Sequence, residues 1–128
     1  MKLLLDTHAL LWWLAGDTRQ LSRRARAAIA ETHHVVHVSA ASAWEISTKH
    51  RLGKLDASAL EGRLMQVVTE QEFVELPISV DHAERAGSLP GDHRDPFDRM
   101  LIAQAQAERL VLVSNDELFD EFGIQRLW

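Results

Sequence analysis

Acidic side chains at the ends of predicted strands and in the first turns of predicted helices are the residues of this sequence that could do chemistry. They are Asp6, Glu45, Asp95, Asp98 and Asp116. Two carboxylates about 4 Å apart repel by about 4 kcal/mol at an effective dielectric constant near 20. A cluster of them therefore raises carboxylate pKa values or recruits a metal ion or basic side chains. Carboxylates with water in the remaining positions suit Mg²⁺ or Mn²⁺, which can activate a water molecule and offset the charge of a phosphodiester.

Two of these acids begin the helix predicted within residues 93–107. Asp95 suits an N-cap, Pro96 suits the first helical position, and Asp98 then falls in the first turn, where the helix dipole favours a carboxylate. Apolar residues follow at helical spacing. On this stretch alone a well-capped helix explains the pattern, so a functional site requires that other acids reach the same point.

Strand and helix signals alternate along the chain and predict an α/β fold, with a parallel sheet covered on both faces. Strands are predicted over residues 2–5, 35–38, 73–76, 110–113 and 124–127. Helices are predicted over residues 7–14, 22–32, 40–51, 56 or 58 to 70, 79–86 and 116–122, besides the one that Asp95 begins, with a loop over 89–94. Ligands of such sheets bind beyond the carboxyl ends of the strands. Asp6 and Asp116 meet there only if the first and fourth strands are neighbours, which the pattern does not determine.

Length and composition restrict the class of protein. The 128 residues suit a single domain, residues 1–128, and 46% hydrophobic content is ordinary for a globular protein. The sequence has no cysteine, which excludes disulfides and thiolate metal sites. No apolar run approaches the roughly 18 residues of a membrane span, and the N-terminus does not read as a secretory signal. We therefore expect a cytoplasmic protein without a membrane partner. The net charge of −5 disfavours nucleic acid, but the local distribution of charge matters more.

Five stretches of the sequence, spread in order over nearly the whole chain, resemble the PIN-domain ribonucleases and, more closely, the VapC-like toxins of bacterial toxin–antitoxin pairs. They are DTHALLWWL (6–14), SAASAWEI (39–46), STKHRLGKL (47–55), HRDPFDRMLIAQAQA (93–107) and RLVLVSND (109–116). The resemblance implies a three-layer α/β/α sandwich around a five-stranded parallel sheet of order 3-2-1-4-5. In that order the first and fourth strands are neighbours.

The resemblance also implies a function and its residues. By this resemblance, the protein is expected to be an endoribonuclease that depends on Mg²⁺ or Mn²⁺ and is the toxin of a toxin–antitoxin pair. The metal ligands, direct or through water, would be Asp6, Glu45, Asp98 and Asp116, with Asp98 preferred to Asp95 for its spacing from the alanine-rich part of its helix. An activated water would attack RNA in line and leave a 5′-phosphate and a 3′-hydroxyl. The implied partners are RNA, a second copy of the chain in a homodimer, and an antitoxin that places an Arg or Lys in the acidic pocket.

The polar residues beside the acids can each have more than one role. Ser114 or Asn115 could orient a carboxylate or the attacking water, and Thr7 could do so beside Asp6. His8 and His93 could assist the reaction or touch phosphate, but a histidine near a helix start is more often a surface or capping group.

A lysine and three tryptophans also remain open. Lys49 fits either an ion pair with Glu45, four residues earlier, or a phosphate contact. Trp12, Trp13 and Trp44 could stack bases, although packing in the core or in a dimer is the more common use of tryptophan.

Three other classes of protein share some of these features. A haloacid-dehalogenase-type phosphatase needs a second Asp where this chain has His8. A receiver-type phosphoacceptor domain needs paired acids after the first strand and an Asp after the third, but Asp6 stands alone and the third predicted strand ends at Pro77. A catalytically silent PIN-fold binding module is the remaining alternative, and the presence of all four acids speaks against it.

Overall fold

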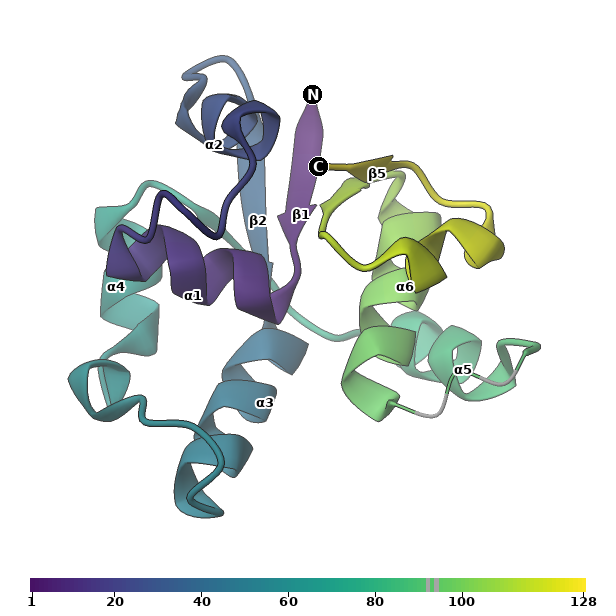
Figure 1. The fold of residues 1–128 in the computed structure, drawn as a ribbon. Coiled ribbons are helices and arrows are strands. Elements are labelled where there is room, and N and C mark those ends of the chain that lie inside the picture. Colours follow the sequence, from purple (N-terminus) through teal and green to yellow (C-terminus); the bar gives the residue numbers. More distant parts are fainter. Residues whose placement is uncertain (92, 94) are drawn as a thin grey trace.

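A five-stranded parallel sheet runs through the computed structural model, which describes residues 1–91, 93 and 95–128 (Figure 1). The strands are β1 (Lys2–Leu5), β2 (Val35–Ser39), β3 (Val74–Leu76), β4 (Val111–Val113) and β5 (Arg126–Leu127). Their order is β3-β2-β1-β4-β5, and every neighbouring pair is parallel. This confirms the α/β class and the order 3-2-1-4-5 that the resemblance implies.

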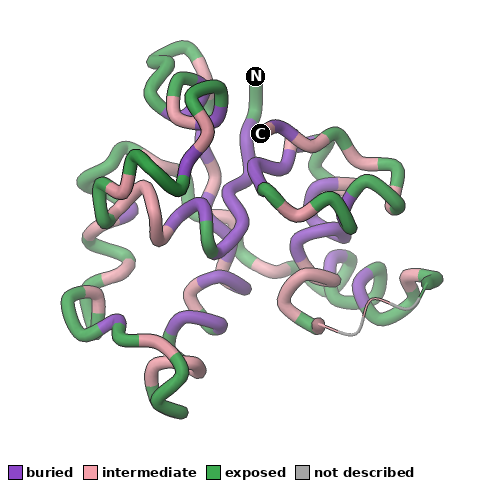
Figure 2. Tube along the Cα trace, viewed as in Figure 1, coloured by how far each residue is buried: buried purple, intermediate pink, exposed green. Residues whose placement is uncertain are grey.

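Helices cover both faces of the sheet. They are α1 (Thr7–Ala15), α2 (Arg23–Ala30), α3 (Ala40–Arg51), α4 (Leu64–Glu70), α5 (Val80–Ser88) and α6 (Pro96–Glu108), with 3-10 turns η1 (Ser58–Leu60) and η2 (Glu117–Phe122). Side chains of a strand alternate between faces. Leu3 and Leu5 accordingly pack with α1, α2 and α4, whereas Leu4 packs with α6 and η2. The buried residues gather on the strands and on the helix sides that face them (Figure 2).

Short polar side chains begin most of the helices at the carboxyl ends of the strands. Asp6 caps α1, Ser39 caps α3 and Asp95 caps α6, and each side chain accepts a hydrogen bond from a backbone N–H of the first turn. Such caps satisfy donors that have no partner within the helix. As a result, the residues that follow β1 and β2 and the residues that begin α6 have fixed backbone positions.

Two predicted helices differ in the structure. The helix expected from residue 56 or 58 to 70 consists of η1 and α4, because the chain turns between them at Gly62, whose φ of +72° is incompatible with a right-handed helix. The helix expected over 116–122 is the 3-10 turn η2. It ends at Gly123, whose φ of +69° does not continue a right-handed helix.

Several element ends also differ from the prediction. The strand expected over 124–127 is reduced to β5, since only Arg126 and Leu127 find partners on the three-residue strand β4. The helix expected over 22–32 ends at Ala30, where Glu31 takes extended backbone angles. The predicted loop over 89–94 contains Asp92 and Arg94, which lie outside the described residues. Among the described residues, none of the helices has the length and apolar character needed to cross a bilayer.

Candidate active site

The five acids that the sequence singles out line one cavity of about 440 Å³ at the carboxyl edge of the sheet. The strand register explains why they meet. Leu5 pairs with Val113, so Asp6 and Ser114 leave neighbouring strands side by side. α3 and α6 then bring Glu45, Asp95 and Asp98 to the same edge. The structure therefore places all four acids that the resemblance assigns to the metal site, and Asp95 with them, around one space.

Asp6 has a fixed orientation. Its Oδ1 accepts a hydrogen bond of 2.8 Å from the backbone N–H of Ala9, and the Ser114 hydroxyl also hydrogen-bonds its carboxylate. Only 6% of the residue is exposed. Burial raises the pKa of Asp6, the hydrogen bonds oppose this, and the charge of Glu45 adds to the rise. Asp6 is thus a rigid carboxylate in a place that disfavours its own negative charge.

Glu45 is held through both carboxylate oxygens. Its Oε1 accepts a hydrogen bond from the Thr7 hydroxyl, and its Oε2 forms an ion pair with Lys49 Nζ. Ser42 Oγ lies 3.0 Å from Thr7 Oγ1 and completes this buried group. The hydrogen bond with Glu45 raises the pKa of Lys49. Of the two interpretations of Lys49, the structure shows the ion pair, and Thr7 orients Glu45 rather than Asp6 as expected.

Asp95 and Asp98 sit together at the beginning of α6. Asp95 Oδ1 accepts hydrogen bonds from the backbone N–H groups of Phe97 and Asp98, at 2.9 and 3.2 Å, which confirms its predicted capping role. Asp98 Oδ2 points toward His93, with 3.2 Å to the imidazole Nε2. Burial raises the pKa of Asp98 to about 7, helped by the charges of Asp95, Glu45, Asp6 and Asp116. The predicted effect of crowded carboxylates is therefore strongest at Asp98.

Ser114 connects the fourth acid to the first. The Ser114 hydroxyl oxygen accepts a hydrogen bond of 3.0 Å from the backbone N–H of Asp116, and the hydroxyl also contacts the Asp6 carboxylate. Asp116 Oδ1 in turn accepts from the backbone N–H of Leu118 and begins η2. Ser114 is fully buried, whereas Asn115 is exposed at the cavity. Of these two candidates, Ser114 is the one that orients a carboxylate.

The aromatic residues beside the acids have different environments. Trp12 and Trp13 are partly buried and pack against the core, as the common use of tryptophan predicts. Trp44 is 61% exposed and meets Phe97 edge to face, so core packing is the wrong interpretation for it. His8 is exposed and stacks on Trp12.

The donor set of the cavity fits a hard divalent cation. It offers carboxylate oxygens, which Mg²⁺ and Mn²⁺ prefer, and Lys49 is the only lysine or arginine among its described lining residues. The carboxylates line the cavity, but their oxygens do not converge on a single metal position. Within residues 1–91, 93 and 95–128, no three Asp, Glu or His side chains are grouped as an assembled metal site. Lys49 and Thr7 occupy the Glu45 oxygens in this arrangement.

Charge rather than size distinguishes this cavity. A larger one of about 670 Å³ lies between α3, η1 and α4. It is lined mainly by apolar and small residues and carries a single carboxylate, Glu61, besides His50 and Arg51. It lacks the convergence of acids that metal-assisted chemistry requires.

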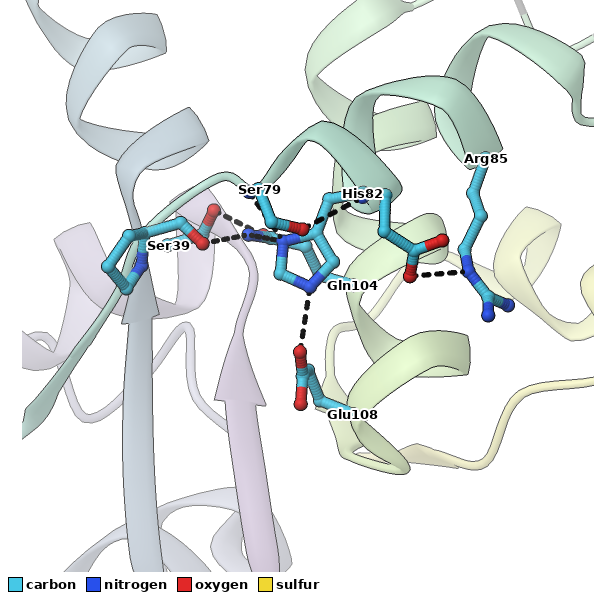
Figure 3. A network of polar contacts seen from close by, with 8 residues as sticks. Ser39, Ser79, His82, Arg85, Gln104 and Glu108 are labelled. Carbon is cyan, nitrogen blue, oxygen red and sulfur yellow. Dashed lines mark hydrogen bonds and ion pairs between the residues drawn. The ribbon is translucent and has the colours of Figure 1, made fainter.

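A buried polar network behind the site links the segments that carry the acids, and the sequence did not point to it (Figure 3). Ser39, the cap of α3, donates to Gln104 Oε1 in α6. Gln104 Nε2 donates to the backbone oxygen of Pro77, and His82 of α5 contacts Glu108 through Nε2 at 2.8 Å. The only signal in the sequence is Gln104 itself, a polar residue within the apolar stripe of its helix.

The profile of the PIN domain matches residues 3–125, nearly the whole chain. The chain therefore belongs to the PIN-domain family, as the resemblance of its five stretches predicts.

Several solved structures are similar to it. VapBC2 from Rickettsia felis, bound to a fragment of promoter DNA, has a TM-score of 0.72 at 14% identity, with 98% of this chain and 97% of that chain covered. DNA-bound VapBC from Salmonella typhimurium gives 0.69 at 20% identity, with 98% and 96% covered. A toxin–antitoxin complex from Klebsiella pneumoniae gives 0.57 at 23% identity, with 89% and 86% covered. These likenesses show a shared fold. No curated protein matches the sequence significantly.

Proposed function

We propose that this protein is a metal-dependent endoribonuclease and the toxin of a toxin–antitoxin pair. The observation that carries the proposal is the convergence of Asp6, Glu45, Asp98 and Asp116 on one cavity, where Lys49 is the one lysine or arginine among the lining residues that the structure describes. Membership of the PIN-domain family supports it. The fold shared with VapBC proteins and with a toxin–antitoxin complex supports the second half of the proposal.

The four carboxylates would hold one or two Mg²⁺ or Mn²⁺ ions. When bound, such an ion activates water as a nucleophile and stabilises the charge that develops on the phosphodiester. The chain itself fixes the ligands before any ion or RNA arrives. Ser114 orients Asp6, and Thr7 orients Glu45. Lys49 neutralises Glu45 in the free protein, and burial among the other carboxylates raises the pKa of Asp98 to about 7.

The same charge suggests how a protein partner would inhibit the site. Among the described lining residues, five carboxylates outnumber one lysine and make the cavity negative. An Arg or Lys from an antitoxin would offset the repulsion and take the place of a metal ion. The proposal includes an RNA substrate, an antitoxin and a homodimer as partners. A catalytically silent binding module is the competing function.

Cleavage of a mixed RNA pool tests the proposal. The antitoxin-free protein is assayed with Mg²⁺ or Mn²⁺, then with EDTA, beside the variant Asp98→Asn. Asp120→Asn is the matched control, because Asp120 is an exposed carboxylate paired with Arg126 outside the cavity. We expect cleavage that requires both the metal and Asp98, is unchanged in the control, and leaves 5′-phosphate ends. A cyclic phosphate product would refute the hydrolytic mechanism. Cleavage that persists in Asp98→Asn would refute the site.

A further inference from the structure

The exposed imidazole of His8 stacks on the partly buried indole of Trp12 directly beside the carboxylates. His8 and Trp12 both line the acid cavity. Their ring centroids are 5.5 Å apart, and 23° separates their planes. Trp128 contacts Trp12 from a tilted position, with 5.9 Å between centroids. Trp12 and Trp128 are partly buried while His8 is exposed, so His8 is the exposed end of this row of rings at the cavity.

The helix that fixes Asp6 also fixes these rings. His8 and Trp12 stand four residues apart in α1, a spacing that places side chains on one face of a helix. Asp6 caps the same helix, and fully buried Ala9 and Leu10 anchor it to the core. The rings and the carboxylate are therefore held in one rigid unit and need no rearrangement to act together. Packing against the core explains why one face of Trp12 is covered. It does not explain why the exposed imidazole of His8 stacks on Trp12 at the cavity.

We propose that His8 and Trp12 form a subsite that binds an unpaired nucleobase of RNA by stacking, while the neighbouring phosphodiester lies at the carboxylates. This inference rests on the proposed nuclease function and adds the side chains that would hold an unpaired base beside the reacting phosphodiester. Proteins that read single-stranded RNA stack splayed bases on aromatic side chains, histidine included. A base within a duplex has its faces covered by its neighbours and cannot stack in this way.

The charge of the cavity makes an uncharged attraction valuable. Five carboxylates repel the phosphates of RNA, and Lys49, the only lysine or arginine among the described lining residues, is paired with Glu45. Stacking does not depend on charge. It therefore retains RNA at a site whose electrostatics oppose it, and it does so on the side of the cavity where Asp6 stands.

Binding of a fluorescent, mixed-sequence single-stranded RNA of about 12 nucleotides tests the subsite separately from cleavage. The variant Asp98→Asn with Mg²⁺ is the parent, because it should bind RNA without cutting it. Adding His8→Ala should weaken binding about tenfold, in line with the loss of one stacked base. Adding His8→Phe should keep affinity within about threefold, because the stacking face remains. His33→Ala, which removes another exposed histidine, should leave binding unchanged.

Two further measurements separate the explanations. A duplex RNA of the same length should bind His8→Ala and its parent equally. Binding of the single strand should quench tryptophan fluorescence, and Trp12→Phe should lose most of that quenching while affinity persists. If Phe at position 8 weakens binding as much as Ala, the imidazole acts through its charge and the stacking subsite is wrong. Equal binding by His8→Ala and the parent, or no measurable binding of the single strand, also overturns it. Neither result would change the expectation that cleavage depends on Asp98, so failure of the subsite is distinguishable from failure of the proposed function.

Discussion

Replacing Asp98 with Asn should remove a penalty that grows with pH in the metal-free protein. The Asp98 carboxyl group has a pKa of about 7 in the folded chain against 3.8 ordinarily. The folded state therefore binds this proton more tightly than the unfolded state. The contribution of Asp98 to the free energy of unfolding is complete below about pH 4, falls as the pH rises to about 7, and is constant above that.

The size of the effect follows from those two pKa values. Between pH 5 and pH 8, the unfolded carboxyl group is almost fully ionised throughout, whereas the folded one passes from protonated to ionised. Linkage then gives a loss of roughly 2.5 kcal/mol in the free energy of unfolding. For a chain of this length that is roughly 10 °C in melting temperature. An Asn at position 98 does not titrate, so its variant should lack this loss.

Urea denaturation in EDTA at pH 5 and pH 8 measures the difference. Asp120→Asn is the control, because the hydrogen bond with Arg126 lowers the pKa of Asp120 and leaves that group ionised at both pH values. The control should therefore lose as much stability as wild type. Mg²⁺ added at pH 8 should restore stability to the wild type by binding the native state, and less so to Asp98→Asn. The reasoning fails if wild type and Asp98→Asn lose the same free energy between the two pH values.

Three other substitutions probe the site and its support. Lys49→Met should bind Mn²⁺ several-fold more tightly in calorimetric titration, because it frees Glu45 from its ion pair; weaker binding would mean that Lys49 assembles the site rather than competing for it. Gln104→Leu should cost about 1–3 kcal/mol in urea denaturation, because it leaves the buried Ser39 hydroxyl without its acceptor; an unchanged midpoint would show that the network carries no stability. Leu4→Ala should cost about 2–5 kcal/mol in the same assay through the cavity it leaves in the core, and a loss well below that would mean that the core collapses around the missing side chain.

Local sequence signals account for much of the scaffold. Asp95 was predicted as a cap because a short polar side chain before an apolar, helical pattern has few other uses. The helix break at Gly62 was missed because the residues on both sides of it favour a helix, and a single glycine is tolerated in one. The order of the strands came from the resemblance, since periodicity does not say which strands are neighbours.

Contacts between distant segments set the limits of what the sequence could predict for the site. Five acids were singled out because the carboxyl ends of parallel strands share an edge, and the resemblance selected four of them. The pairing of Thr7 with Glu45 and the raised pKa of Asp98, in contrast, depend on distances between helices. Gln104 and His82 were missed because polar residues in helices usually face solvent. Each of these needed the packed structure.

The central position of β1 has a consequence for the order in which the chain is made. β1 is the first strand synthesised, yet it lies between β2 and β4. When the chain has been synthesised only as far as β3, the edge of β1 that pairs with β4 has no partner. Asp98 and Asp116 lie in the later part of the chain, which contains β4. The complete set of carboxylates therefore assembles only with the last third of the chain.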